Sequence, residues 1–135
     1  MDNLYRDFIL EHYRQPHNKG TLDPHDLHWA DSNPTCGDEL SMTLVLDDAK
    51  ASVADVAFDG RGCAISQASA SILTDELRGM DLDAVRAIDP AEVLDNLGVP
   101  IGPARLKCAL LAWKVLQGAV NGDRAAWPEA AEAAP

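Results

Sequence analysis

The spacing of apolar residues predicts a helix at the start of the chain. Between residues 3 and 15, apolar side chains recur at helical spacing and form a stripe on one face. Pro16 is expected to stop this helix, because proline removes a backbone donor and clashes with the preceding turn. Turn-forming residues then fill 16–34, and only residues 27–32 have the pattern of a short strand.

An alternating pattern follows. Met42, Leu44 and Leu46 recur at every second position between residues 39 and 47, as in a strand that is buried on one face. After a short turn, residues 53–59 have the composition of a second strand. Two neighbouring strands joined by a short loop predict an antiparallel hairpin.

The second half of the chain is predicted to be helical. Helices are expected over 64–78, 81–87 and 90–97, followed by a long helix that Pro103 opens and Gly122 closes. One helix, then strands, then helices indicate an α+β fold, in which helices cover a small antiparallel sheet of about three strands. We expect a single domain over residues 1–122 and a frayed tail over 123–135.

Composition and charge narrow the function classes. The chain has 135 residues, of which 47% are hydrophobic and 24% charged, so a packed core is expected rather than disorder. Its formal net charge of −11 repels phosphate backbones and anionic lipids, which argues against nucleic-acid and membrane-surface binding. No signal peptide or apolar run of membrane-spanning length is present in the sequence, so we expect a cytoplasmic protein.

Three cysteines are the candidates for chemistry. Cys63 follows Cys36 by 27 positions and Cys108 follows Cys63 by 45, so no pair forms a Cys-x-x-Cys motif. An odd number of cysteines without a secretory signal favours metal or thiol chemistry over a disulfide scaffold.

The predicted hairpin gathers two of these cysteines and an acid. Cys36 and Asp38 lie just before its first strand, and Cys63 lies just after its second strand. Because the start of one antiparallel strand neighbours the end of the next, we expect these three residues to lie close together.

The third cysteine completes a candidate ligand set. Cys108 lies near the start of the long helix, beside Arg105 and Lys107, and these cations are expected to favour its thiolate. Three thiolates with the Asp38 carboxylate would form a four-ligand set that suits zinc, and such a cage would also hold iron. The carboxylate is the most exchangeable of the four ligands, which suggests a site that opens.

Three short segments carry a resemblance to a known family. They are Asn-Pro-Thr-Cys-Gly-Asp at 33–38, Gly-Arg-Gly-Cys-Ala-Ile-Ser-Gln-Ala-Ser at 60–69 and Arg-Leu-Lys-Cys at 105–108. Together with residues 4–20, they resemble the IscU/NifU/SufU family of iron–sulfur cluster assembly scaffold and sulfur-acceptor proteins. The similarity extends to about residue 120.

The resemblance implies a SufE/NifU-like fold and a function in iron–sulfur cluster assembly. It implies Cys36, Asp38, Cys63 and Cys108 as ligands of zinc or iron, and of a transient [2Fe–2S] cluster. It implies a cysteine desulfurase as the partner that donates persulfide sulfur, and iron–sulfur apoproteins as downstream partners.

The chain combines features of two branches of this family. It resembles SufU in the Arg-x-Lys-Cys motif, with Lys107 where IscU proteins carry a histidine, but it lacks the usual SufU insertion between the second and third cysteines. By the SufU resemblance, Cys36 would accept the sulfur, and by the IscU resemblance Cys108 would do so. The sequence leaves both open.

Two other classes of function compete with sulfur transfer. A structural zinc module that binds a protein partner needs the same ligands. An enzyme with a cysteine nucleophile is disfavoured, because no motif places a histidine base beside a cysteine. The four histidines are therefore expected in turns, at the surface or half-buried rather than as ligands; they are His12, His17, His25 and His28. Trp127 is expected to be loose in the tail.

Overall fold

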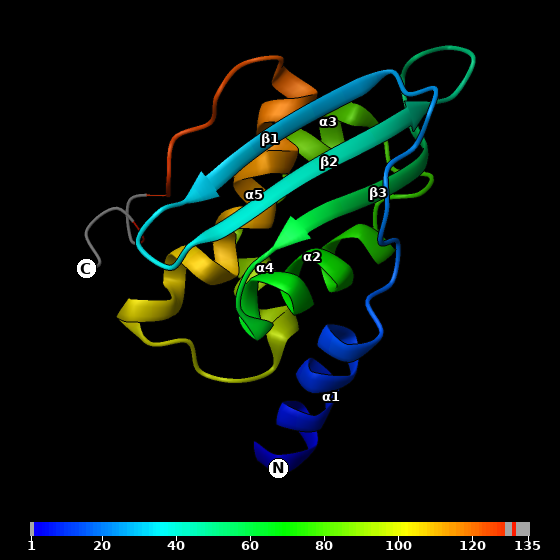
Figure 1. The fold of residues 1–135 in the computed structure, drawn as a ribbon. Coiled ribbons are helices and arrows are strands. Elements are labelled where there is room, and N and C mark those ends of the chain that lie inside the picture. Colours follow the sequence, from blue (N-terminus) through cyan, green and yellow to red (C-terminus); the bar gives the residue numbers. More distant parts are fainter. Residues whose placement is uncertain (1, 129–130, 132–135) are drawn as a thin grey trace.

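The fold is a three-stranded antiparallel sheet with helices against one face (Figure 1). The structure is a computed structural model that describes residues 2–128 and residue 131. Its elements in chain order are α1 (Asp2–Arg14), β1 (Leu27–Asn33), β2 (Asp38–Leu46), β3 (Val53–Arg61), α2 (Ala64–Asp75), α3 (Leu82–Arg86), α4 (Pro90–Leu97), the 3-10 helix η1 (Pro103–Arg105) and α5 (Leu106–Asn121). The expected α+β architecture is confirmed.

The central strand β2 follows the alternation expected from the sequence. Leu40, Met42 and Leu44 are almost fully buried and point into the core between the sheet and the helices. β2 pairs with β1 on one side and β3 on the other, so that Met42 lies opposite both Trp29 and Phe58. The inward-facing side chains of the three strands therefore pack into the same core.

The outer edge of β3 is covered by the segment that follows α1. The Phe58 N–H donates to the Asn18 carbonyl at 2.9 Å, and the Gly20 N–H donates to the Phe58 carbonyl at 2.7 Å. The sequence predicted only turns here. Pairing of this segment with the edge strand satisfies backbone groups that would otherwise stay open to another chain.

Helix α5 lies directly against the sheet. At Gly118, an added Cβ would collide with the ring of Trp29, so α5 comes closer to β1 than any larger residue would allow. Helix α2 is hydrogen-bonded to α5 near the N-terminal end of α5, where the Ser69 hydroxyl of α2 donates to the Ala109 carbonyl at 2.7 Å. These contacts fix the start of α5, and with it Cys108, relative to the sheet.

Helix boundaries differ from the prediction in two places. α2 ends at Asp75 instead of residue 78, because the N–H groups of Glu76 and Leu77 bond to carbonyls three residues back and turn Leu77 into the core. Pro103 opens a 3-10 turn, and α5 itself begins at Leu106.

The described part of the tail lies against the molecule. Lys107 Nζ and Lys114 Nζ lie 5.6 and 5.2 Å from the centre of the Trp127 ring, so the expectation of a loose Trp127 is wrong. The rest of the predicted frayed tail, residues 129–130 and 132–135, lies outside the described residues. Within residues 2–128 and 131, none of the helices has the length and apolar character needed to cross a bilayer.

Candidate metal centre

Strand pairing brings the predicted site residues to one end of the sheet. Asn33 pairs with Asp38, so Cys36 lies in the tight loop that joins β1 to β2. Glu39 pairs with Arg61 at the same end, and Cys63 follows as the residue that caps the N-terminus of α2. The pairing expected from the hairpin is present, and the shorter strand β1 adds a second hairpin with Cys36 in its loop.

Asp38 is the buried acid of this site. Its residue is 0% exposed, and its Oδ1 accepts the Cys63 N–H at 2.9 Å. Its Oδ2 is buried and has no hydrogen-bond partner within the described residues. A buried carboxylate oxygen without a partner is unfavourable, so this atom is available to a cation.

Gly62 allows Asp38 to approach the start of α2. A Cβ at position 62 would collide with the Asp38 carboxylate and with the Ser66 hydroxyl. Only glycine leaves room for the carboxylate at this point, because any side chain would displace it from the Cys63 N–H.

Cys108 approaches from the opposite side, on the first turn of α5. It is 0% exposed, and its Sγ lies 3.2 Å from the Sγ of Cys36. The Asn33 side-chain amide donates to the same sulfur at 3.9 Å. One ligand atom from each of Cys36, Asp38 and Cys108 lies within 4.8 Å of the other two. These three residues therefore converge although 72 positions separate the two cysteines.

Cys63 lies next to this group but does not join it at that distance. It is close enough to Cys108 to act on its pKa. Burial raises the pKa of the Cys108 thiol well above its usual range, and the neighbouring Cys36 and Cys63 raise the pKa further.

The cations beside Cys108 do not have the expected effect. Arg105 and Lys107 were expected to favour the Cys108 thiolate, but Arg105 is exposed and Lys107 lies over the Trp127 ring. Sequence neighbours on a helix point in different directions, whereas desolvation acts on the buried sulfur itself.

The donor set suits zinc or iron. Two sulfurs and a carboxylate oxygen are already gathered, with a third sulfur adjacent, and this combination matches tetrahedral zinc sites. In such a site the sulfurs lie about 3.8 Å apart, so the Cys36 and Cys108 sulfurs, now 3.2 Å apart, need to separate by only about 0.6 Å. The orphaned Oδ2 of Asp38 would gain the partner that the chain does not give it.

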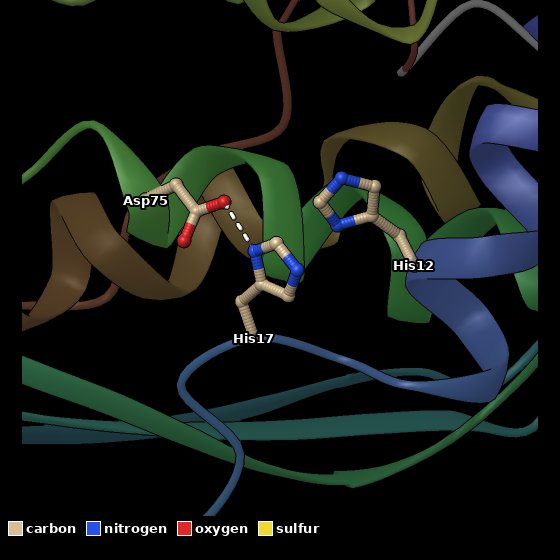
Figure 2. A group of neighbouring side chains, drawn as sticks. All are labelled: His12, His17 and Asp75. Atoms are coloured by element: carbon tan, nitrogen blue, oxygen red, sulfur yellow. Dashed lines mark hydrogen bonds and ion pairs between the residues drawn. The ribbon is translucent and has the colours of Figure 1, made fainter.

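A second cluster of metal-binding residue types was missed by the sequence reading. His12, His17 and Asp75 lie together at the far end of α2 (Figure 2). His12 is only 7% exposed, because α1 packs against α2. The neighbour of these histidines is Asp75, which lies 58 positions from His17 in the chain, so no local motif indicates the cluster.

Comparison with known proteins identifies the family and agrees with the fold. The profile of the NifU-like N-terminal domain matches residues 4–125. The zinc-dependent sulfurtransferase SufU of Bacillus subtilis is 38% identical, over 89% of this chain and 91% of the relative. The iron–sulfur cluster assembly scaffold protein IscU of Streptococcus pyogenes is 34% identical, over 90% and 85% of the two chains.

A solved structure extends the likeness to three dimensions. The N-terminal part of a nitrogen-fixing NifU-like protein from Brucella abortus superposes with a TM-score of 0.72 and covers 89% of this chain and 94% of that one. At 24% identity this similarity concerns the fold. With a profile match over most of its length and a SufU relative covered almost end to end, the chain belongs to the family of NifU-like N-terminal domains.

Proposed function

We propose that this protein accepts sulfur from the persulfide of a cysteine desulfurase and supplies it for iron–sulfur cluster assembly. The observation that carries the proposal is the convergence of Cys36, Asp38 and Cys108 around a buried carboxylate oxygen without a partner. The SufU and IscU relatives, one a zinc-dependent sulfurtransferase and the other a cluster assembly scaffold, support the same reaction class.

The proposed ligands are Cys36, Asp38, Cys63 and Cys108. Asp38 Oδ1 is engaged by the Cys63 N–H, which orients the carboxylate and leaves Oδ2 for the metal. Cys63 would supply the fourth donor from the N-terminus of α2. Zinc held by this set would keep its thiol ligands deprotonated at neutral pH and lower their nucleophilicity while they remain bound.

Cys36 is the proposed sulfur acceptor. It is exposed on the β1–β2 loop, whereas Cys63 is partly buried and Cys108 is fully buried, so Cys36 is the most accessible of the three to the cysteine of a second protein. The Cys36 thiolate would attack the outer sulfur of the donor persulfide. A new sulfur–sulfur bond forms on Cys36, the donor's own sulfur–sulfur bond breaks, and its electron pair leaves on the cysteine thiolate of the desulfurase.

Asp38 would make this exchange possible. A carboxylate oxygen is a harder and more exchangeable ligand than a thiolate, so it can adjust its bonding while Cys36 leaves and returns. Cys63 and Cys108 would stay in place, since one caps α2 and the other is buried in the first turn of α5.

The sulfur, and the iron with which it combines, are cargo in this proposal. The same thiols would hold a [2Fe–2S] cluster transiently before its transfer to iron–sulfur apoproteins. The excess of acidic residues, 22 against 11 basic ones, would steer basic partner surfaces towards the protein.

Persulfide mapping tests the proposal. The zinc-loaded protein is incubated with a cysteine desulfurase and free cysteine, and each cysteine-containing peptide is then analysed by mass spectrometry. We expect a mass gain of one sulfur on the Cys36 peptide of the wild type, and no gain on any peptide of Cys36→Ser. Metal binding without a persulfide on any cysteine would instead favour the structural zinc module.

A further inference from the structure

His12, His17 and Asp75 form a cluster that the proposed sulfur chemistry does not use. Cys63 caps the beginning of α2, and Asp75 is its last residue, so the two clusters lie at opposite ends of this helix. Twelve residues of helix correspond to about 17 Å, too far for a shared ion.

The three side chains point towards one another from three elements. His12 comes from α1, His17 from the segment after it and Asp75 from α2, as Figure 2 shows. One ligand atom from each lies within 4.8 Å of the other two. His17 Nδ1 and Asp75 Oδ2 are 2.6 Å apart, and the centres of the two imidazole rings are 4.5 Å apart.

Neighbouring polar groups hold the His12 and Asp75 side chains and the backbone of His17 in place. The Ser71 hydroxyl lies 2.6 Å from His12 Nδ1 and accepts the backbone N–H of His17 at 2.8 Å. The Asn18 amide donates to Asp75 Oδ1 at 3.0 Å. Metal-binding histidines and carboxylates typically have such outer partners, which fix the ring orientation and leave one atom of each ligand free.

We propose that His12, His17 and Asp75 bind a divalent first-row transition-metal ion such as Fe²⁺ or Zn²⁺. Two imidazoles and one carboxylate form a donor set used by both ions, and it leaves coordination positions open. The ion would replace the proton between His17 and Asp75, whose ligand atoms would move apart from 2.6 Å to about 3.3 Å.

The surroundings favour a site that exchanges its ion. The side chains of His17 and Asp75 are 54% and 39% exposed, so an ion can enter and leave from solvent. His12 is buried next to the exposed Phe8, and the centres of the two rings are 4.7 Å apart in an edge-to-face arrangement. This side of the site is therefore shielded from solvent. The net charge of −11 raises the local concentration of cations.

Titration of the metal-free protein with Co²⁺ separates this site from the cysteine site. Cobalt bound by thiolates gives an intense near-ultraviolet charge-transfer band, whereas cobalt bound by imidazole and carboxylate does not. We expect the wild type to bind two Co²⁺ ions by calorimetry, and only one of them to give the charge-transfer band. His17→Ala and Asp75→Asn should bind the second ion at least about tenfold more weakly and keep the band unchanged.

His25→Ala is the matched control. His25 is also an exposed histidine in the segment between α1 and β1, but among residues 2–128 and 131 it belongs to no cluster of three metal-ligating side chains. It should still bind two ions. Equal binding of the second ion by the wild type and by both cluster variants would overturn the proposal. If the wild type gave no charge-transfer band while the two cluster variants still lost the second ion, the result would count against the cysteine ligands and support the histidine cluster.

A second measurement needs no variant. In nuclear magnetic resonance spectra of the wild type loaded with one equivalent of zinc, which the cysteine site takes up first, added Co²⁺ should shift or broaden the ring signals of His12 and His17 and leave those of His25 and His28 sharp. Unchanged signals of His12 and His17 at saturating Co²⁺ would overturn the proposal.

Discussion

Asp38 and Cys63 are joined by a hydrogen bond from the Cys63 N–H to the Asp38 Oδ1 at 2.9 Å. This bond links the first residue of β2 to the cap of α2, and it holds the carboxylate with its second oxygen directed into the buried site. The backbone of one proposed ligand therefore orients the side chain of another. The first prediction concerns this pair.

Asp38→Asn keeps the shape of the side chain but removes its negative charge. We expect zinc affinity to fall by at least about tenfold, since a neutral amide is a poorer ligand than a carboxylate. A competition titration against a coloured chelator measures the change. Asp48→Asn, in the turn at the other end of β2, is the control and should bind zinc as the wild type does. Equal affinities of the two variants would remove Asp38 from the ligand set.

Gly62→Ala tests the close approach of the helix cap to Asp38. The added methyl group would collide with the carboxylate and with the Ser66 hydroxyl, so we expect a loss of about 1–3 kcal/mol in stability and weaker zinc binding. Gly102→Ala is a strict control, because nothing lies within 4 Å of its added Cβ and its φ of −72° suits any residue. Chemical denaturation of the two variants should separate them clearly.

Removal of the metal should lower the stability of the fold. The proposed ligands come from β2, the cap of α2, the first turn of α5 and the β1–β2 loop, so metal binding to the folded state would count as folding free energy. A thousandfold excess of free zinc over its dissociation constant stabilises by about 4 kcal/mol. Thermal melting should therefore show a lower Tm after chelation for the wild type. Cys63→Ser should show a much smaller effect of the chelator on its Tm, and a chelator effect of wild-type size there would exclude Cys63.

Lys114 and Asp31 form a buried ion pair. The side chains are 3% and 7% exposed, and Arg124 lies 3.5 Å from the same acid. Lys114→Met would leave a buried carboxylate without its main partner, at a cost of about 3–5 kcal/mol in unfolding free energy.

Two further variants separate pairing from packing. Lys50→Met breaks a comparable but exposed pair with Asp26 and should cost no more than about 1 kcal/mol. The double variant Asp31→Asn with Lys114→Met should recover part of the loss, because no uncompensated charge remains. Urea unfolding measures the free energy of unfolding of each variant. A double variant less stable than Lys114→Met alone would show that the loss comes from packing rather than from the unpaired charge.

The same pair predicts an acid dependence of stability. Burial alone would raise the pKa of the Asp31 carboxyl, but the hydrogen bonds from Lys114 and from the Ser32 N–H outweigh it and hold the pKa below its usual value. A lowered pKa in the folded state stabilises fully above the unfolded value of about 3.9, and the contribution is lost as the pH falls through the folded value. Between pH 6 and pH 2, stability should fall less steeply in Asp31→Asn than in the wild type.

Local signals in the sequence determined most of the helices and strands, and they determined that Asp38 lies near Cys63. Strong alternation around Met42 and Leu44 identified β2, and Asp89 and Pro90 marked the start of α4, where the Asp89 side chain accepts the Ala91 N–H at 2.8 Å. Hairpin topology was enough to bring Asp38 and Cys63 together, because antiparallel pairing fixes which strand ends are neighbours.

Helix ends and the charge environment of Cys108 were predicted less well. The end of α2 depends on Leu77 turning into the core, which no propensity indicates. The pKa of Cys108 depends on burial against the sheet, which outweighs the cations beside it in sequence.

The sequence by itself determined the α+β class, the order of the elements and the residue types able to hold a metal, because periodicity and turn chemistry act over a few neighbouring residues. Only the tertiary structure decided that Cys108 meets Cys36 and that His12 and His17 meet Asp75. These contacts join residues that are distant in the chain, and their geometry depends on how whole helices pack against the sheet and against one another.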